Sequence, residues 1–276
     1  MMAEFTEVAA GVHVLRHESL NVNSTLIVGD GGALLVDTLS GPGQGRELAE
    51  AVRRLTPAPL AAVNTHHHFD HCFGNAAFRE AGGGAIWGHR DAVAQLRDHG
   101  PNWQRAWYEQ WLPTQPELAE ELSGAAIAAP TRVVHRSATL DVGGRRVELR
   151  HLGRGHTEGD LVVLVPDAAV VVAGDLVEQG GPPDFTDSYP LEWPETVTAL
   201  LELVSPDTVV VPGHGVPVDR DFVSEAHRQL SELDWLIRYG HRDRATAQAV
   251  ADRSPFGPEV SLVAVERGFA ELSGRA

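Results

Sequence analysis

The segment Thr65-His66-His67-His68-Phe69-Asp70-His71 carries the strongest structural signal in this chain, because its pattern H-x-H-x-D-H places four potential metal ligands within six residues. His66 and His68 stand two residues apart, so their rings can converge on one ion. Asp70 and His71 then turn toward a second ion beside it. Imidazole and carboxylate are ligands of borderline divalent metals such as zinc, at roughly 2.0–2.2 Å. A solvated histidine-rich loop is the alternative, and the spacing favours a metal site.

Three further ligand candidates follow along the chain: His156 in GRGHTEGD, Asp175 at the end of VVVAGD, and His214 in VVVPGHG. Each lies beside an apolar, β-branched run and is flanked by glycine. Glycine allows a tight turn and a positive φ, so a side chain at a strand end can be aimed inward. One such histidine is usually a structural residue, but four separate strand ends with ligand-type residues favour a metal centre.

In this order, the candidates resemble the metallo-β-lactamase-fold superfamily of binuclear metallohydrolases. The resemblance runs from about Val12 to about Arg220 and includes a hairpin at residues 26–37, whose Asp-Gly-Gly turn joins two apolar strands. It implies an α/β (α+β) fold, a four-layer αββα sandwich, and two zinc ions per chain, with iron or manganese as alternatives. The implied ligands are His66, His68 and His156 for the first ion, Asp70, His71 and His214 for the second, and Asp175 between the two.

The apolar runs predict strand-rich hairpins first and then strands that alternate with helices. Capping residues and the spacing of apolar positions give the helix limits, and the aspartate at residue 91 is expected to cap its helix. Strands are expected near residues 12–16, 24–29, 33–37, 61–65, 85–87, 132–135, 139–142, 145–152, 161–165, 169–173 and 208–211, and helices near 44–55, 91–98 and 194–204.

The chain is long enough for one large domain with an appendage. We expect residues 1–220 to form the metallo-β-lactamase-like domain, with a tryptophan-rich helical insert near residues 100–130. Residues 221–276 are expected to form a helical extension packed on the same domain, because apolar positions such as Leu230 and Leu233 recur on one helix face. This extension covers the sandwich or forms a homodimer contact.

The composition fits a cytoplasmic enzyme that acts on a small molecule. At 276 residues the chain can bury a substantial core. A formal net charge of −16 argues against nucleic acid or an anionic membrane as a partner, because both require a basic footprint. The single cysteine, Cys72, excludes an internal disulfide, fits a reducing compartment, and is expected to be a small buried residue. No signal peptide or membrane-spanning stretch of roughly 20 apolar residues is evident.

The segment 100–130 carries information on the substrate. Trp103, Trp107 and Trp111 recur every four residues and so form one stripe on a helix. The stripe either packs on the core or forms an apolar lid over the metal cleft, where its rings would line a substrate pocket. The sequence leaves both interpretations open.

A second segment, residues 178–193, is rich in glycine, proline and aspartate and follows Asp175 almost directly. This position predicts that it lies at the rim of the cleft. Tyr189 within it is a candidate to donate a hydrogen bond to a developing oxyanion, with a purely structural role as the alternative.

Support for the ligand histidines is expected from nearby polar side chains, because metal-bound imidazoles usually donate their other N–H to a carboxylate, carbonyl or water. Thr65, Asp37 and Thr157 are the nearest candidates. Asp37 ends an apolar strand, where an unpaired carboxylate would be costly. We therefore expect Asp37 under the metal site, bonded to a ligand histidine or to the backbone of residues 65–68.

The resemblance implies a hydrolytic mechanism. Two divalent ions about 3.5–4 Å apart can hold a bridging water and lower its pKa toward 7, and the resulting hydroxide attacks an ester-type carbonyl. Asp70 is expected to hold the second ion and to orient the hydroxide, which gives it a catalytic role as well as a ligand role. No serine or cysteine nucleophile is required, and the sequence has no G-x-S-x-G elbow.

The ligand set is similar to that of glyoxalase II-type thioesterases and of lactonases, so we expect hydrolysis of a thioester, ester or lactone, with weak β-lactam turnover as a side activity. True β-lactamases commonly have cysteine or serine where this chain has Asp175. Some also grip the drug with a lysine, and here all 22 basic residues are arginine. The acidic charge disfavours the nuclease branch, and His68 disfavours the flavodiiron branch.

Two other functions stay open. A mononuclear iron persulfide dioxygenase shares this fold and many of these ligands, and it would leave part of the second site idle. A metal-binding protein without catalytic activity is the other alternative, although a decayed scaffold would be expected to have lost ligands and this chain has lost none.

Overall fold

Seven strands form the first sheet in the order in which they occur along the chain. The computed structural model describes residues 4–275. The hairpins from β1 to β4 are antiparallel, and the pairs from β4 to β7 are parallel. The strands are β1 (Thr6–Ala9), β2 (Val12–Arg16), β3 (Asn23–Val28), β4 (Ala33–Val36), β5 (Leu60–Val63), β6 (Ile86–His89) and β7 (Arg132–Val134).

Five strands form the second sheet, in the order β12-β11-β10-β9-β8. Its pairs are antiparallel except for β11 with β12, which are parallel. A single 3-10 turn at Pro166–Ala168 joins β10 to β11. The strands are β8 (Ser137–Val142), β9 (Arg145–Arg150), β10 (Val162–Val165), β11 (Val170–Gly174) and β12 (Val209–Pro212).

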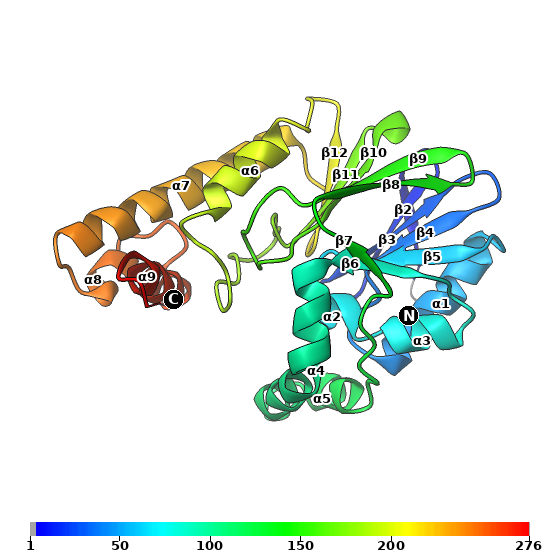
Figure 1. Ribbon diagram of the computed structural model, residues 1–276, viewed down its shortest axis with the longest axis horizontal. Helices are drawn as coiled ribbons and strands as arrows, with labels where there is room; N and C mark the ends of the chain where they lie inside the picture. Colours follow the sequence, from blue (N-terminus) through cyan, green and yellow to red (C-terminus); the bar gives the residue numbers. More distant parts are fainter. Residues whose placement is uncertain (1–3, 276) are drawn as a thin grey trace.

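The two sheets pack face to face, because alternate side chains of each strand point to opposite sides. In β11, Val170 and Val172 belong to the cluster between the sheets, while Val171 and Ala173 belong to the cluster under the helices. The inter-sheet cluster also takes Leu34 from β4 of the first sheet. Two layers of strands with a helical layer on each outer side follow from this pattern (Figure 1). The four-layer αββα sandwich expected from the sequence is therefore confirmed.

Helices cover both outer faces. On the first sheet, Leu48 and Val52 of α1 pack with Phe78 of α3 against Leu35 and Ile86. α4 and α5 lie together at the end of this layer (Figure 1). The helices on this side are α1 (Pro42–Leu55), α2 (Phe69–Cys72), α3 (Asn75–Glu80), α4 (Arg90–Trp111) and α5 (Pro116–Ser123).

The C-terminal helices share one hydrophobic cluster with the outer face of the second sheet. Leu230 and Ile237 of α7 pack there with Val265 of α9 and with Leu164 of β10. In Figure 1 these helices extend to the side of the sandwich opposite to α1. Within residues 4–275, no helix combines the length and hydrophobicity needed to cross a bilayer. The helices here are α6 (Trp193–Leu201), α7 (Arg220–Arg242), α8 (Ala247–Ala251) and α9 (Pro258–Leu272).

The expected cap of α4 was wrong, and α4 ends beyond the expected residue 98. Its N-cap is His89, whose side chain accepts a hydrogen bond from the backbone N–H of Asp91, so Asp91 lies in the first turn instead of capping it. The helix that was expected to end near residue 98 continues through Pro101 to Trp111, so the tryptophan stripe lies on α4 itself. Pro101 is accommodated inside the helix, and the stripe is therefore rigidly joined to the end of β6.

Candidate metal centre

The seven ligand candidates come from strand ends that meet at one edge of the sandwich. The turn after β5 carries His66 and His68, and the first turn of α2 carries Asp70 and His71. His156 lies in the loop between β9 and β10. Asp175 follows β11 and His214 follows β12, and because these two strands are parallel, their carboxyl ends lie side by side.

The first group consists of His66, His68, His156 and Asp175, whose ligand atoms all lie within 4.8 Å of one another. The Nε2 atom of His156 lies 2.9 Å from Nδ1 of His68 and 3.4 Å from Oδ2 of Asp175. The Nε2 atom of His66 lies 3.7 Å from the same oxygen. Three imidazole nitrogens therefore converge near one carboxylate.

The second group consists of Asp70, His71 and His214, and Asp175 contacts it as well. The Nε2 atom of His214 lies 3.3 Å from Oδ2 of Asp70 and 3.3 Å from Oδ2 of Asp175. The Nε2 atom of His71 lies 3.2 Å from Oδ1 of Asp175. Asp175 is thus the only carboxylate among the seven that contacts both groups.

Unpaired polar atoms at the centre fit the presence of cations. The Nε2 atom of His66 and the Oδ1 atom of Asp175 are buried without a hydrogen-bond partner, although buried polar groups normally have one. The lack of a side chain at Gly213 keeps the space beside Asp175 open, because a Cβ atom at this position would lie 1.6 Å from Oδ1 of Asp175. Gly174, just before this aspartate, has a positive φ of 56°. The donor set of imidazoles and carboxylates suits zinc-type ions.

Asp37 lies beneath the centre and orients its loop. Its Oδ2 atom is 2.8 Å from Nδ1 of His71, and its Oδ1 atom accepts the backbone N–H of Thr65 at 2.7 Å. Asp37 is only 2% exposed and adopts a left-handed φ of 64° at the end of β4. Its expected place under the metal site is confirmed. The expectation for Thr157 was wrong, because its hydroxyl donates to Asp160 instead of a ligand histidine.

Asp187 is a functional candidate that the sequence analysis missed. Its two carboxylate oxygens lie 3.0 Å from Nε2 of His68 and 3.1 Å from Nε2 of His67. Trp103 stacks on His67, with ring centroids 4.7 Å apart. Asp187 and His68 are 119 residues apart along the chain, and a contact over this separation leaves no local sequence signal. The only hint was the aspartate-rich composition of residues 178–193.

Burial and the neighbouring carboxylates polarise the ligands. Burial lowers the pKa of His156 to about 4 and that of His66 well below its usual value. Burial alone would also lower the pKa of His68, but Asp187 and the other carboxylates raise it to about 9. Burial would raise the pKa of Asp175, yet His71 and the other imidazoles hold it well below its usual range. Asp175 is therefore an anion, and His66 and His156 offer free lone pairs.

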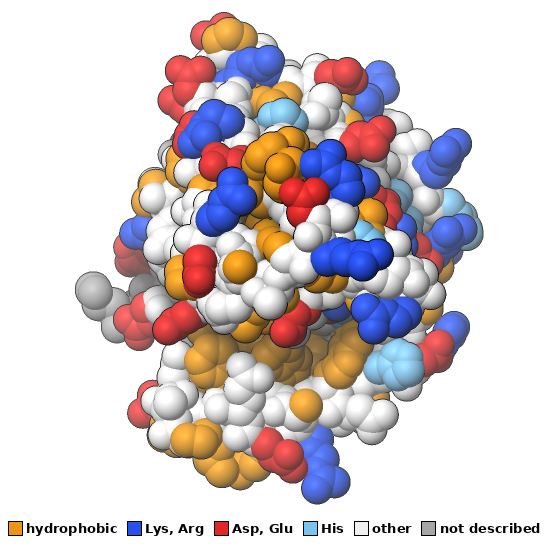
Figure 2. All heavy atoms as spheres, turned by 90° about the vertical axis from the view of Figure 1, so that its left-hand side faces the viewer, with side chains coloured by type: hydrophobic (Ala, Val, Ile, Leu, Met, Phe, Trp, Pro, Cys, Tyr) orange, Lys and Arg blue, Asp and Glu red, His pale blue; other side chains and the backbone are white. Residues whose placement is uncertain are grey.

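A cavity of about 340 Å³ opens onto these ligands. Trp107 and Trp111 of α4 line it and contact Phe69, with ring centroids 5.1 and 6.5 Å apart. Seen from the side of α7–α9, the surface has a hollow with hydrophobic side chains inside it (Figure 2). The lining residues are Leu20, His68, Phe69, Asp70, Trp107, Gln110, Trp111, His156, Asp175, Glu178, Asp184, Thr186 and His214.

A family model described as the Metallo-beta-lactamase superfamily matches residues 18–214. The chain belongs to this superfamily. It is 26% identical over 207 residues to metallo-beta-lactamase type 2 of Bacillus cereus, and the match covers 74% of this chain and 70% of that protein. It is 31% identical over 187 residues to acyl-coenzyme A thioesterase MBLAC2 of Homo sapiens, where it covers 63% of this chain and 62% of that protein. Membership supports a metal-dependent hydrolase.

Solved structures agree with the fold. A metallo-beta-lactamase from Pontibacter korlensis superposes with a TM-score of 0.66 at 20% identity, covering 83% of this chain and 99% of that chain. The mono-zinc form of the metallo-beta-lactamase FIM-1 from Pseudomonas aeruginosa gives a TM-score of 0.67 at 19% identity, covering 85% and 97%. At these identities the similarity establishes the superfamily fold alone.

The other residues singled out from the sequence differ in whether they line the cavity. Trp107 and Trp111 line the cavity, whereas Trp103 lies behind the centre against His67. Tyr189 is not among the lining residues, and its hydroxyl donates to Glu158 at 3.4 Å while Arg154 lies over its ring. Cys72 is buried, as expected, and its thiol donates to the backbone carbonyls of the ligand loop.

Proposed function

We propose that this protein is a two-metal hydrolase of thioesters, esters or lactones. The observation that carries the proposal is the convergence of seven donor side chains into two groups that share Asp175. Both groups are complete and largely buried, so a function that uses only one of them would leave costly uncompensated side chains in the other. This argues for hydrolysis over the one-iron dioxygenase alternative.

The proposed roles follow from position. His66, His68 and His156 would hold the first ion, Asp70, His71 and His214 the second, and Asp175 both, and the ions would supply a hydroxide at neutral pH and polarise the substrate carbonyl. Asp70 lines the cavity, so its carboxylate can orient the attacking water. Asp37 fixes the ring of His71 through Nδ1. Phe69 and Trp107 form an apolar wall that excludes bulk water from the reacting carbonyl.

No reactive cysteine or serine lies beside the cavity among residues 4–275, and the hydroxyl of Thr186, which lines it, donates to Asp184. Cys72 is next to a ligand, but burial raises the pKa of its thiol well above the usual value, which suppresses the reactive thiolate. No serine lines the cavity. The human relative is a thioesterase by name, which supports an acyl carbonyl as the electrophile. Tyr189 has no part in this scheme.

The test combines metal analysis with a hydrolysis screen over thioesters, lactones, aryl esters, phosphodiesters and a chromogenic β-lactam. We expect about two zinc ions per chain and turnover of an acyl substrate. Asp70→Ala should lower kcat by at least about 10²-fold, because a ligand and an orienting group vanish together. Asp184→Ala is the matched control, since Asp184 lines the same cavity but lies outside the two ligand groups.

Two results would reject the proposal. One is an Asp70→Ala enzyme with near-normal kcat on the best substrate. The other is a single iron per chain together with no hydrolysis, which would make the persulfide dioxygenase the leading function.

A further inference from the structure

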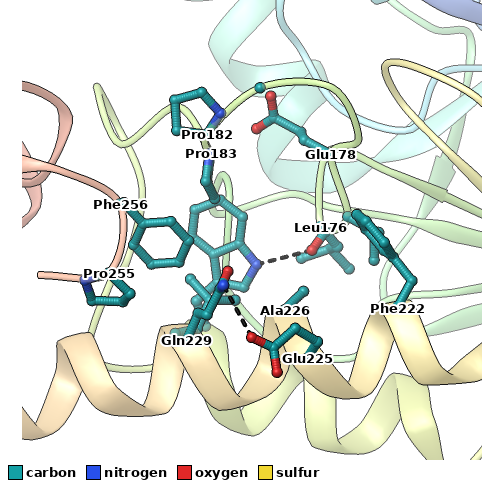
Figure 3. A pocket seen from close by; sticks show the side chains of 14 residues that line it. Leu176, Glu178, Pro182, Pro183, Phe222, Glu225, Ala226, Gln229, Pro255 and Phe256 are labelled. Carbon is teal, nitrogen blue, oxygen red and sulfur yellow. Dashed lines mark hydrogen bonds between the residues drawn. The ribbon is translucent and has the colours of Figure 1, made fainter.

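A second cavity lies beside the metal centre, between α7 and the segments at residues 176–183 and 255–256 (Figure 3). Its volume is about 360 Å³, within the range of small-ligand pockets, which are mostly apolar with few polar groups. Phe222 and Ala226 of α7 lie on one side, and Phe256, Pro182 and Pro183 lie across from them (Figure 3). None of the lining residues is a metal ligand proposed above.

Two side chains connect this cavity with the metal centre. Glu178 lines both cavities, and its Oε1 atom lies 3.9 Å from Nδ1 of His156. Trp193 lines the second cavity, and its ring also contacts His156 edge-on, with ring centroids 5.6 Å apart. The second cavity is therefore one side chain away from the first metal group. Glu178 thus forms a wall that the two cavities share.

The lining selects for an uncharged, apolar group. The indole N–H of Trp193 already donates to the carbonyl of Leu176 at 3.2 Å, and the amide of Gln229 donates to Glu225 at 3.1 Å (Figure 3). The acidic side chains of the lining are Glu178 and Glu225, of which Glu225 is paired with Arg228 at 2.6 Å. None of the described lining residues is basic. A phosphate or carboxylate would find no basic partner in this lining, whereas a hydrocarbon chain has no polar group to satisfy.

We propose that this second cavity receives the apolar acyl group of the substrate, while the leaving group lies on the other side, against Trp107 and Gln110. The inference rests on the proposed hydrolysis. In that reaction a water oxygen forms the new bond to the acyl carbon and the bond to the sulfur or oxygen leaving group breaks. The fatty or aryl carboxylate and the free thiol or alcohol are the products. Side chains of α7 and of the loop before α9 thereby set the acyl-chain preference.

The experiment is an acyl series from acetyl to decanoyl on one uncharged thiol, N-acetylcysteamine. In the unaltered protein kcat/KM should rise about threefold to fourfold per methylene while the cavity fills, as expected for burial of one CH₂ group. Ala226→Trp places an indole in the cavity and should lower the decanoyl-to-acetyl ratio of kcat/KM at least about tenfold. Ser224→Trp is the control, because Ser224 is exposed on the same helix and does not line the cavity; it should keep the ratio.

A loss of activity that is equal for acetyl and decanoyl thioesters in Ala226→Trp would overturn the proposal. The proposal would also be overturned if kcat/KM of the unaltered protein did not depend on the length of the acyl chain. Ala226→Leu, a smaller obstruction, serves if thermal melts show that the tryptophan variant does not fold.

Binding of N-methyldecanamide, followed by tryptophan fluorescence, separates this inference from the proposed function. If none of the thioesters, esters and lactones is hydrolysed, the proposed function fails. Tighter amide binding to the unaltered protein than to Ala226→Trp would then still support the cavity. Equal binding to both proteins would refute it.

Discussion

Replacing Asp187 by alanine should weaken the first metal site although Asp187 is not a ligand. Its carboxylate accepts from Nε2 of His68 at 3.0 Å and so turns Nδ1 of that ring toward His156. Loss of such an orienting partner typically costs about 10–100-fold in metal affinity, or about 1.4–2.8 kcal/mol. Because Asp187 is 37% exposed, we expect a value toward the lower end, about tenfold.

The assay is a competition titration of zinc against a chromogenic chelator, with activity measured on the same samples. Asp184→Ala is the control, since it removes a carboxylate of the same loop that contacts no ligand histidine by hydrogen bonding. Asp187→Asn keeps one acceptor and should fall between the two. His67→Gln should leave zinc affinity within about twofold, because His67 contacts Asp187 but is not in the first ligand group. Zinc affinity unchanged in Asp187→Ala would refute this reasoning.

Three further perturbations test other parts of the structure. Gly213→Ala should abolish binding of at least one metal in atomic-absorption measurements, because its Cβ would lie 1.6 Å from Oδ1 of Asp175; two bound ions in a folded variant would contradict the geometry. Trp107→Ala should raise KM and lower the free energy of unfolding by only about 1–2 kcal/mol, because the indole is half-buried at the cavity. A fully buried tryptophan would cost roughly 3–5 kcal/mol. A loss of that size with unchanged KM, in melts and kinetics on the same preparation, would mean that Trp107 belongs to the core. Burial and the stacked His151 lower the pKa of His89 to about 4, so the unfolded chain, with a histidine pKa of about 6.5, binds a proton first as pH falls. The free energy of unfolding should therefore decrease between about pH 6.5 and 4, and less so in His89→Asn; parallel urea-denaturation series of the metal-free proteins with identical pH slopes would argue against this.

The convergence of the candidate ligands could be predicted from the sequence because each lies in a short pattern that has its own physical meaning. His66 and His68 are spaced for convergence, and glycines flank Asp175 and His214, so local conformation and ligand type appear together. Individual strands followed from apolar runs, such as the strand expected near residues 169–173 and found at Val170–Gly174, and the sandwich followed from the family resemblance. These are properties of neighbouring residues, which a sequence displays directly.

The features that could not be predicted depend on contacts between distant segments. Asp187 reaches the ligand loop across 119 residues, and nothing beside it distinguishes it from Asp184. Whether Tyr189 faced the cavity depended on which side of its loop turned outward. The cap of α4 was misassigned because His89 ends a strand and caps a helix at once, a role that sequence statistics give to Asp91. The second cavity needs α7 and the Pro255 loop to meet, which no local pattern records.

The position of the candidate ligands on both sheets has a mechanical consequence. His66 to His71 leave the first sheet after β5, whereas Asp175 and His214 leave the second after β11 and β12. Ions held between them would clamp the two halves of the sandwich at one edge, much as a cross-link closes a long loop and restricts the unfolded chain. Removal of the ions by a chelator would then weaken the structure as well as abolish activity. The carboxylates of Asp70 and Asp175 would face each other without a cation between the two sheets, and amide hydrogens near these strand ends should exchange faster.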